Sequence, residues 1–257
     1  MLEIEISKNV ARVTLDRPGV HNAFNGELVA RIASAFEDLG KRSDVRVVVL
    51  AGNGRSFCAG ADLGWMRQAV DFTPDENLAD ARKTAAMFRA VALCPKPVIA
   101  RVHGAALGGG AGLVAAADIA IAHEAALFGF TEVRLGIVPG VISPYVVARI
   151  GVGRAREYCL TGRKFPARVA QSIGLLHSTA SDTESLDADI RAATEEILLA
   201  GPEAAGETKS LIAEVSTRSL DAAADYGARA LARARSGEEG RAGIRAFLER
   251  QRPPWTR

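Results

Sequence analysis

Hydrophobic and polar residues alternate at the start of the chain, which predicts a β-hairpin. Residues 2–6 read Leu-Glu-Ile-Glu-Ile, residues 7–9 are polar and suited to a turn, and alternation resumes over residues 11–15. Successive side chains of a strand point to opposite faces, so each run has one apolar face. The Asp-Arg-Pro-Gly sequence at residues 16–19 is expected to end the second strand.

Beyond the hairpin, continuous apolar runs alternate with segments of helical periodicity. A continuous apolar run is typical of a strand buried on both faces, whereas recurrence every three or four residues indicates one face of a helix. We predict strands at residues 45–51, 98–102 and 118–123, and helices at residues 28–39 and 76–93. Gly40 is the expected C-cap of the first helix. This alternation predicts parallel strands and an α/β fold.

The last part of the chain has a helical pattern. From about Ile142 onward the sequence shows helical periodicity and little strand signal. We therefore expect an α/β core over residues 1–200 and a helical C-terminal region over residues 201–257. The apolar stretch at residues 104–122 is interrupted by glycines and by Asp118, so it is interpreted as loop, helix and strand in succession and not as a membrane span.

Composition and charge narrow the class of protein. The 257 residues include 48% hydrophobic and 24% charged residues, and the formal net charge is only +2. This near balance offers no strong field for nucleic acid or for a membrane surface, and we expect neither as a partner. The three cysteines have no CxxC spacing, and the acidic N-terminus does not resemble a signal peptide. We expect a soluble protein of the cytoplasm.

Two glycine-containing loops follow predicted strands and are candidates for ligand binding. Residues 56–63 follow the strand at 45–51, and residues 103–113 follow the strand at 98–102 and contain three consecutive glycines. Loops at the carboxyl ends of parallel strands form the ligand crevice of such sheets. Free backbone N–H groups at a helix start can stabilise a developing oxyanion, helped by the helix dipole. One N–H group from each loop would form an oxyanion hole.

Glu132 is the candidate acid–base residue. It lies in the apolar context Phe-Gly-Phe-Thr-Glu-Val, which is expected to raise its pKa towards a value useful for a general base. A pair of N–H groups and one such glutamate suit proton transfer next to a carbonyl group. Cys58, His21 and His103 lie in or beside the two loops, and we interpret all three as structural residues.

Together these motifs resemble the enoyl-CoA hydratase/isomerase (crotonase) superfamily over nearly the whole chain. The resemblance rests on residues 17–24, 59–63, 108–110, 132, 136–140, 160–163 and 247–255. It implies a ClpP/crotonase-like spiral of ββα units, with a helical C-terminal region that forms a homotrimer or a dimer of trimers. It also implies an acyl-CoA thioester as the substrate, with no metal and no further cofactor, because coenzyme A is part of the substrate.

The resemblance also implies the site residues, by motif position. The backbone N–H groups of Ala61 and Gly109 match the family's oxyanion hole, and Glu132 matches a catalytic glutamate. The resemblance also implies contacts with the substrate and its coenzyme A. Val20 and Ala59 match positions near the adenine end of coenzyme A. The other matched contact residues are Asp62, Leu63, Gly64 and Gly108.

One departure from the family pattern bears on the reaction. Typical hydratases of the family carry two glutamates, and the position of the first is Gly112 here. A single carboxylate can move a proton between two carbon atoms, which favours double-bond isomerisation. It can also activate water, in which case the second proton transfer falls to the same glutamate or to another group.

The local sequence favours hydration instead. Residues 61–67, 76–81 and 141–147 resemble bacterial methylglutaconyl-CoA hydratases. Our first choice is therefore the reversible addition of water to a short or branched 2-enoyl-CoA, with 3-methylglutaconyl-CoA of leucine degradation as one candidate. Isomerisation of an enoyl-CoA is the second. Arg67 and Arg134 are candidate partners for the second carboxylate of a dicarboxylic substrate.

Two interpretations from other classes of protein stay open. Gly110, Gly112 and Ala115 match a dinucleotide-binding fingerprint, although the match lies in the middle of the chain and leaves Glu132 without a role. Without the first glutamate, the chain could also be a catalytically silent module that binds acyl-CoA.

Overall fold

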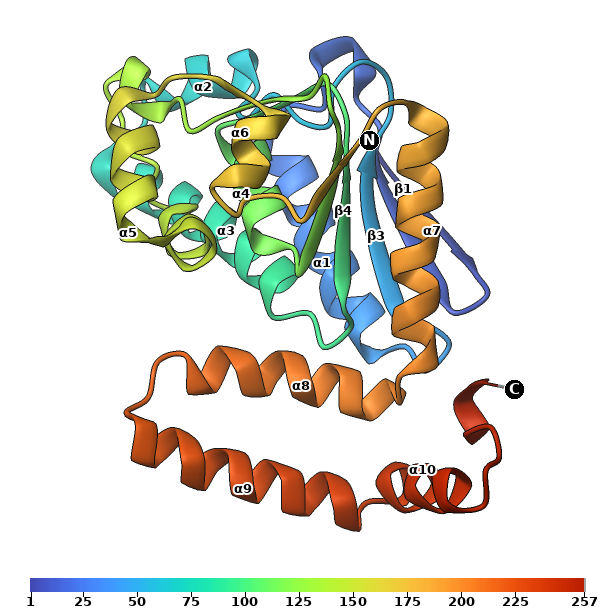
Figure 1. Cartoon of the computed structure of the whole chain (residues 1–257). Coiled ribbons are helices and arrows are strands. Elements are labelled where there is room, and N and C mark those ends of the chain that lie inside the picture. The colour runs from blue at the N-terminus through green and yellow to red at the C-terminus, as the bar shows by residue number, and fades with distance from the viewer. Residues whose placement is uncertain (257) are drawn as a thin grey trace.

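A six-stranded sheet forms the centre of the computed structural model, which describes residues 1–256 (Figure 1). Its order is β1-β2-β3-β4-β6-β9, in which β1 and β2 form the antiparallel hairpin and the other neighbours are parallel. The hairpin and the three central strands predicted from the sequence are confirmed. The strands are β1 (Leu2–Ser7), β2 (Val10–Leu15), β3 (Val47–Gly52), β4 (Val98–Val102), β6 (Ile119–His123) and β9 (Ser178–Ala180).

A smaller sheet carries the segments that lead into the candidate site. β5 (Ala105–Leu107) comes shortly after β4 in the chain, and β7 (Leu127–Gly129) comes shortly after β6. β5 and β7 pair in parallel, and β8 (Phe165–Pro166) pairs with β7 in the antiparallel direction. The chain thus adds one strand to each sheet before its next helix, which is a ββα arrangement.

Helices cover both faces of the large sheet (Figure 1). Val48 and Leu50 of β3 belong to the core on one face, whereas Val47 and Val49 pack beside Leu186 on the other. Alternate residues of β3 are therefore buried on opposite faces, as its continuous apolar run predicts. The helices are α1 (Gly26–Lys41), α2 (Leu63–Ala69), α3 (Pro74–Ala92), α4 (Gly109–Ala116), α5 (Ser143–Thr161), α6 (Ala167–Ser172), α7 (Thr183–Leu199), α8 (Pro202–Val215), α9 (Leu220–Ser236) and α10 (Glu238–Leu248).

The predicted C-cap at Gly40 is wrong. Helix α1 runs through Gly40 to Lys41, and Arg42 is its C-cap. A Cβ atom at Gly40 would lie 2.8 Å from Cδ of Pro95, which is shorter than real contacts allow. Gly40 therefore lets α1 approach the segment before β4, and it does not end the helix.

The expectation of little strand structure after Ile142 is confirmed, because β8 and β9 are the strands that the structure describes within residues 142–256. Both are very short, and β9 extends the large sheet at its edge by pairing with β6. The apolar stretch at residues 104–122 forms the short strand β5 where a loop was expected, followed by α4 and β6 as predicted. Among residues 1–256, no helix is both long and apolar enough to cross a membrane.

Helices α8 to α10 form a separate layer, and polar contacts link the C-terminal region to the core (Figure 1). Nζ of Lys209 in α8 lies 2.7 Å from Oδ2 of Asp118, and the same carboxylate oxygen accepts a 2.7 Å hydrogen bond from the Val98 N–H group. Arg46 donates a 3.0 Å hydrogen bond from Nη1 to the carbonyl oxygen of Trp255. The division of the chain at residue 200 stays a prediction.

We predict that Lys209→Met weakens the attachment of α8. The side chains of Lys209 and Asp118 are only 14% and 30% exposed, so the substitution leaves a partly desolvated carboxylate without its cation. We expect a loss of about 1–2 kcal/mol in the free energy of unfolding, less than for a fully buried pair. Thermal and denaturant unfolding measure this loss. The control is Arg229→Met in the exposed Arg229–Asp225 pair, which should change stability very little. Equal losses in both variants would contradict the proposed attachment.

Candidate active site

The two glycine-containing loops contact each other through their backbones. The Cys58 N–H group donates to the carbonyl oxygen of Ala105, and the Leu107 N–H group donates to that of Cys58, each at 3.0 Å. Gly60 has a φ of +95°, and a Cβ atom there would lie 2.9 Å from the Leu107 carbonyl oxygen and 3.7 Å from the Gly109 nitrogen. Only glycine suits both this conformation and this close approach.

The Ala61 N–H group points away from Phe24, with which Ala61 forms a backbone bridge. Phe24 forms a parallel bridge with Ala61, in which the Phe24 N–H group donates to the Gly60 carbonyl oxygen and the Asp62 N–H group donates to that of Phe24, each at 2.7 Å. These bonds use the groups that flank Ala61. Within residues 1–256 the Ala61 N–H group has no acceptor, and Ala61 is exposed. Its N–H group is therefore available to a ligand.

The Gly109 N–H group is available in the same way. Gly109 is the first residue of α4, where the N–H groups have no partner inside the helix. Gly108 precedes it with a φ of 51° and a ψ of −122°, and the Gly108 N–H group donates to the Gly129 carbonyl oxygen at 2.8 Å. The part of the chain that the structure describes contains no acceptor for the Gly109 N–H group. The predicted pair of amides thus lies on two adjoining loops.

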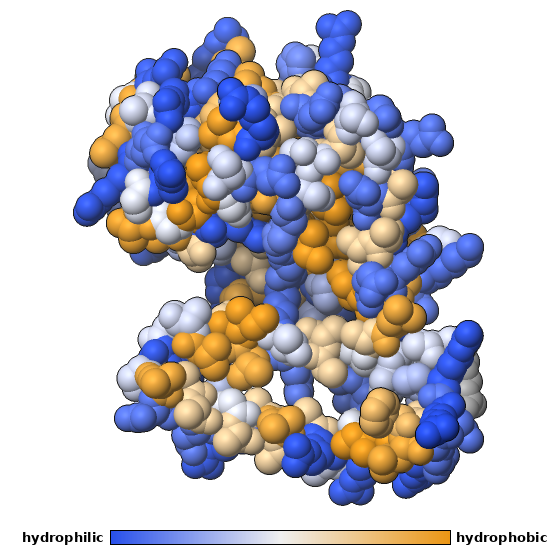
Figure 2. Space-filling view, in the orientation of Figure 1, coloured by the Kyte–Doolittle hydropathy of each residue, from blue (hydrophilic) through white to orange (hydrophobic). Residues whose placement is uncertain are grey.

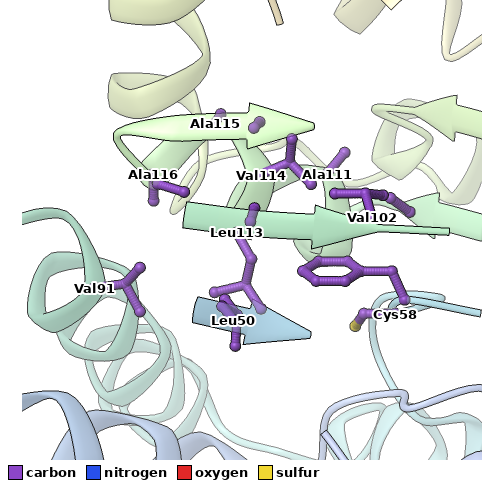
Figure 3. Packing of buried hydrophobic residues seen from close by; sticks show 14 of the residues in the cluster. Leu50, Cys58, Val91, Val102, Ala111, Leu113, Val114, Ala115 and Ala116 are labelled. Atoms are coloured by element: carbon purple, nitrogen blue, oxygen red, sulfur yellow. The ribbon is translucent and has the colours of Figure 1, made fainter. Parts of the chain in front are cut away.

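Helix α4 is held firmly in the core. Figure 3 shows its apolar side chains packed against the strands of the large sheet and against α3. Leu113 is fully buried, as are Leu50 of β3, Val91 of α3 and Val102 of β4. This packing fixes the direction in which the first N–H groups of α4 point.

Glu132 is brought beside the second loop by strand pairing. It begins a 3₁₀ segment (Glu132–Leu135) shortly after β7, and β7 pairs with β5, which leads into Gly108. A Cβ atom at Gly108 would lie 3.3 Å from Oε1 of Glu132. The other oxygen, Oε2, is buried and has no hydrogen-bond partner in residues 1–256. Burial raises the pKa of Glu132, as its apolar sequence context predicts.

Apolar side chains surround Gly112. A Cβ atom at Gly112 would lie 2.3 Å from Cγ2 of Ile142 and 3.0 Å from Cε1 of Phe88. Ile142 is 1% exposed and Phe88 is fully buried. A glutamate at position 112 has no space in this structure, because Ile142 and Phe88 fill the volume that its side chain would need.

The residues predicted to contact the substrate differ in their exposure and in whether their polar groups already form hydrogen bonds. Leu63 is 71% exposed and Val20 is 43% exposed, so both can contact a ligand. The Ala59 N–H group already donates to the His21 carbonyl oxygen. Oδ1 of Asp62 accepts hydrogen bonds from the N–H groups of Gly64 and Trp65, at 2.7 and 3.3 Å, as the N-cap of α2.

A second bond occupies the carboxylate of Asp62. Its Oδ2 accepts a 3.0 Å hydrogen bond from Nη2 of Arg17. Arg17 belongs to a motif noted in the sequence, but its role became visible only when the fold joined it to Asp62.

The interpretation of Cys58 and His103 as structural residues agrees with their surroundings. Cys58 is fully buried, and burial raises the pKa of its thiol to about 12, so it stays protonated and unreactive. Nε2 of His103 lies 2.9 Å from the Gly54 carbonyl oxygen. Among residues 1–256 no cluster of three or more His, Cys, Asp or Glu side chains could hold a metal ion.

The structure also bears on the two candidate arginines and on the dinucleotide-binding interpretation. Nε of Arg134 donates a 3.3 Å hydrogen bond to the Thr161 carbonyl oxygen, whereas Arg67 is exposed on α2 and forms no ion pair within the described chain. A Cβ atom at Gly110 would lie 2.1 Å from the Cys58 carbonyl oxygen. Gly110 and Gly112 therefore face the core and not a bound pyrophosphate, which removes the basis of the dinucleotide interpretation.

Comparison with known proteins agrees with this geometry. The family model described as enoyl-CoA hydratase/isomerase matches residues 5–257. The enoyl-CoA hydratase ACTT6 of Alternaria alternata is 32% identical over 95% of this chain and 80% of its own length. Among solved structures, Pseudomonas aeruginosa AtuE is 34% identical with a TM-score of 0.96, covering 100% of this chain and 99% of AtuE. An enoyl-CoA hydratase of Shewanella pealeana is 35% identical with a TM-score of 0.95, covering 99% and 95%.

These matches confirm the crotonase fold predicted from the sequence, and they confirm the prediction of an enzyme of this class. They extend over nearly the whole chain and do not depend on any single motif. The chain therefore belongs to the enoyl-CoA hydratase/isomerase family.

Proposed function

We propose that the protein is an enoyl-CoA hydratase that adds water reversibly to a short or branched 2-enoyl-CoA. The observation that carries this proposal is the buried Oε2 atom of Glu132, which has no partner in residues 1–256 and belongs to a side chain that lies against Gly108. A partly desolvated carboxylate beside the loop that carries the free Gly109 N–H group is an arrangement for moving a proton beside a carbonyl group.

The proposed mechanism uses one carboxylate twice. The thioester oxygen of the substrate binds the N–H groups of Ala61 and Gly109, which stabilise the negative charge that develops there. Glu132 takes a proton from water as the water oxygen forms its bond to C3, and the resulting enolate is held by the two N–H groups. Glu132 then returns the proton to C2. Coenzyme A takes part only as a portion of the substrate, and the mechanism requires no metal ion.

Isomerisation of a 3-enoyl-CoA is the second candidate function. It is favoured by the Phe88 and Ile142 side chains next to Gly112, because these nearest side chains offer no hydrogen-bond partner to a water molecule. In this reaction Glu132 removes a proton from C2 and returns it to C4, and the same two N–H groups stabilise the dienolate.

For the acyl group we propose a branched and dicarboxylic chain such as 3-methylglutaconyl. Arg67 is the better placed of the two candidate arginines, because the Nε–H group of Arg134 is used by the Thr161 carbonyl oxygen. The exposed Leu63 and Val20 are proposed to contact the pantetheine and adenine portions of coenzyme A, together with the backbone of Ala59.

We further propose a homotrimer or a dimer of trimers in the cytoplasm. Figure 2 shows apolar side chains gathered over the C-terminal helices. Such exposed apolar area is typical of a surface that another subunit covers. The exposed residues that support this include Ile212, Leu220, Leu231, Phe247 and Leu248. The three cysteines are all free thiols, as expected in a reducing compartment.

Glu132→Gln tests the proposed acid–base residue. The substitution keeps the shape of the side chain but removes the proton carrier, so we expect kcat to fall by about 10²- to 10⁴-fold with little change in KM. The control is Glu124→Gln, since Glu124 is an exposed carboxylate on the turn after β6. Steady-state hydration rates measure both variants. A Glu132→Gln enzyme with near-normal kcat would contradict the mechanism.

The raised pKa of Glu132 predicts pH effects of definite sign. The ionised form of Glu132 takes the proton from water. We therefore expect kcat/KM to rise with pH, with an apparent pKa above 4.5, the ordinary pKa of glutamate. Burial favours the protonated form of Glu132 in the folded state. This contribution to stability is complete at pH values below the pKa of Glu132 in the unfolded chain, and it is lost as the pH rises through the pKa of Glu132 in the folded protein. Glu132→Gln should therefore unfold at a higher temperature than the wild type at neutral pH, and this advantage should shrink on acidification. A constant difference at every pH would contradict the burial of the charge.

The substrate class is tested by mass spectrometry of products from crotonyl-CoA, 3-methylglutaconyl-CoA and a 3-enoyl-CoA. We expect the first two to gain one water, and 3-methylglutaconyl-CoA to react faster. Conversion of the 3-enoyl-CoA without a change in mass, and no hydration of the others, would establish the isomerase instead. Binding of all three without turnover would indicate the catalytically silent module.

A further inference from the structure

We propose that Arg17 is a positioning residue that holds the Ala61 N–H group in its catalytic direction by fixing Asp62. This proposal rests on the proposed function, in which the Ala61 N–H group binds the thioester oxygen. Arg17 lies in the turn after β2, far from Asp62 in the sequence, and neither the mechanism above nor the substrate contacts use it.

The guanidinium group of Arg17 connects the two segments that meet at Ala61. Nη1 donates a hydrogen bond to the carbonyl oxygen of Ala23, the residue before Phe24, and Nη2 donates to Oδ2 of Asp62, the residue after Ala61. These bonds run alongside the two backbone bonds that Phe24 forms with Gly60 and Asp62. Arg17 therefore reinforces the bridge from which the Ala61 N–H group projects.

The direction of the Ala61 N–H group depends on this bridge. In a trans peptide unit the C=O and N–H groups point in opposite directions. The Gly60 carbonyl oxygen accepts the Phe24 N–H group at 2.7 Å, so the Ala61 N–H group of the same peptide unit must point the other way. Any movement of residues 60–62 relative to Phe24 consequently tilts that N–H group.

Arg17 is itself held in place. Its backbone N–H group donates a 2.8 Å hydrogen bond to Oδ1 of Asn22, which is fully buried. Nδ2 of Asn22 donates to the carbonyl oxygens of Ser56 and Asn53, at 2.7 and 2.9 Å. The turn that carries Arg17 is thus anchored to the end of β3 and to the start of the loop that contains Ala61.

The Arg17–Asp62 pair is charged and largely shielded from water. The two side chains are 18% and 16% exposed. Burial by itself raises the pKa of Asp62, but the N–H groups of Gly64 and Trp65 and the Arg17 guanidinium outweigh it and hold this pKa below its usual value. Asp62 therefore stays ionised, and its two oxygens hold α2 on one side and Arg17 on the other.

Loss of Arg17 should affect the transition state more than the bound substrate. The negative charge on the thioester oxygen is largest in the enolate, so a tilted N–H group loses most of its effect at that point. A small misplacement of a catalytic group is costly for the same reason. The expected signature is a lower kcat with a nearly unchanged KM.

The test compares Arg17→Met, Asp62→Asn and the double variant with the wild type. Two readouts are used: kcat and KM for the best 2-enoyl-CoA, and the absorbance of bound cinnamoyl-CoA, whose conjugated thioester absorbs at longer wavelength when its carbonyl is polarised. Asp62→Asn keeps an N-cap residue for α2 and provides a second variant if Arg17→Met fails to fold. Arg42→Met is the control, because Arg42 pairs with Asp44 on the exposed surface.

We expect Arg17→Met to lower kcat about 10- to 100-fold, with KM changed less than about threefold and a smaller red shift of cinnamoyl-CoA. Arg17→Lys should recover part of kcat and of the red shift, since it restores the charge. The double variant should lose no more activity than either single variant, because both remove one interaction. Arg42→Met should match the wild type.

Two results would overturn the proposal in different ways. A folded Arg17→Met or Asp62→Asn enzyme with wild-type kcat and wild-type red shift would refute the role of Arg17 and leave the proposed function intact. A wild-type enzyme that neither polarises cinnamoyl-CoA nor turns over any enoyl-CoA would refute the proposed function, and the role of Arg17 with it.

Discussion

The close contact between Gly60 and the Leu107 carbonyl oxygen is the constraint on which the candidate site depends. A Cβ atom at Gly60 would lie 2.9 Å from that oxygen, so the two loops can meet only because no side chain intervenes. Parallel β3 and β4 deliver both loops to one edge of the sheet. The contact then places the Ala61 and Gly109 amides on adjoining backbone, and α4, buried in the core, keeps the second of them in position.

The buried carboxylate of Glu132 lowers the stability of the folded protein. Oε2 of Glu132 is buried and has no hydrogen-bond partner within residues 1–256. An ionised carboxylate in such a position destabilises the folded state. The surrounding structure can tolerate Glu132 because its neighbours are held by strand pairing and by close packing. The same feature that weakens the fold raises the pKa of Glu132 and prepares it to accept a proton.

Gly112 and Ile142 are matched in size. The absence of a side chain at Gly112 and the presence of buried Ile142 belong together, because the isoleucine fills the volume that a residue at position 112 would need. Hydrocarbon therefore lies next to Gly112, and proton transfer falls to Glu132 alone in the mechanism we propose. Introducing a carboxylate at position 112 would require a change at Ile142 as well.

The sequence by itself determined the α/β class, the hairpin and the central strands, because the periodicity of apolar residues reports directly on which faces are buried. It also identified both glycine loops and Glu132, whose local context raises its pKa. Only the tertiary structure decided that Gly40 serves a close contact, that β9 joins the large sheet, that Gly112 is blocked by Ile142 and that Arg17 pairs with Asp62. These features join residues far apart in the chain, and such contacts are set by how elements pack and not by any local pattern.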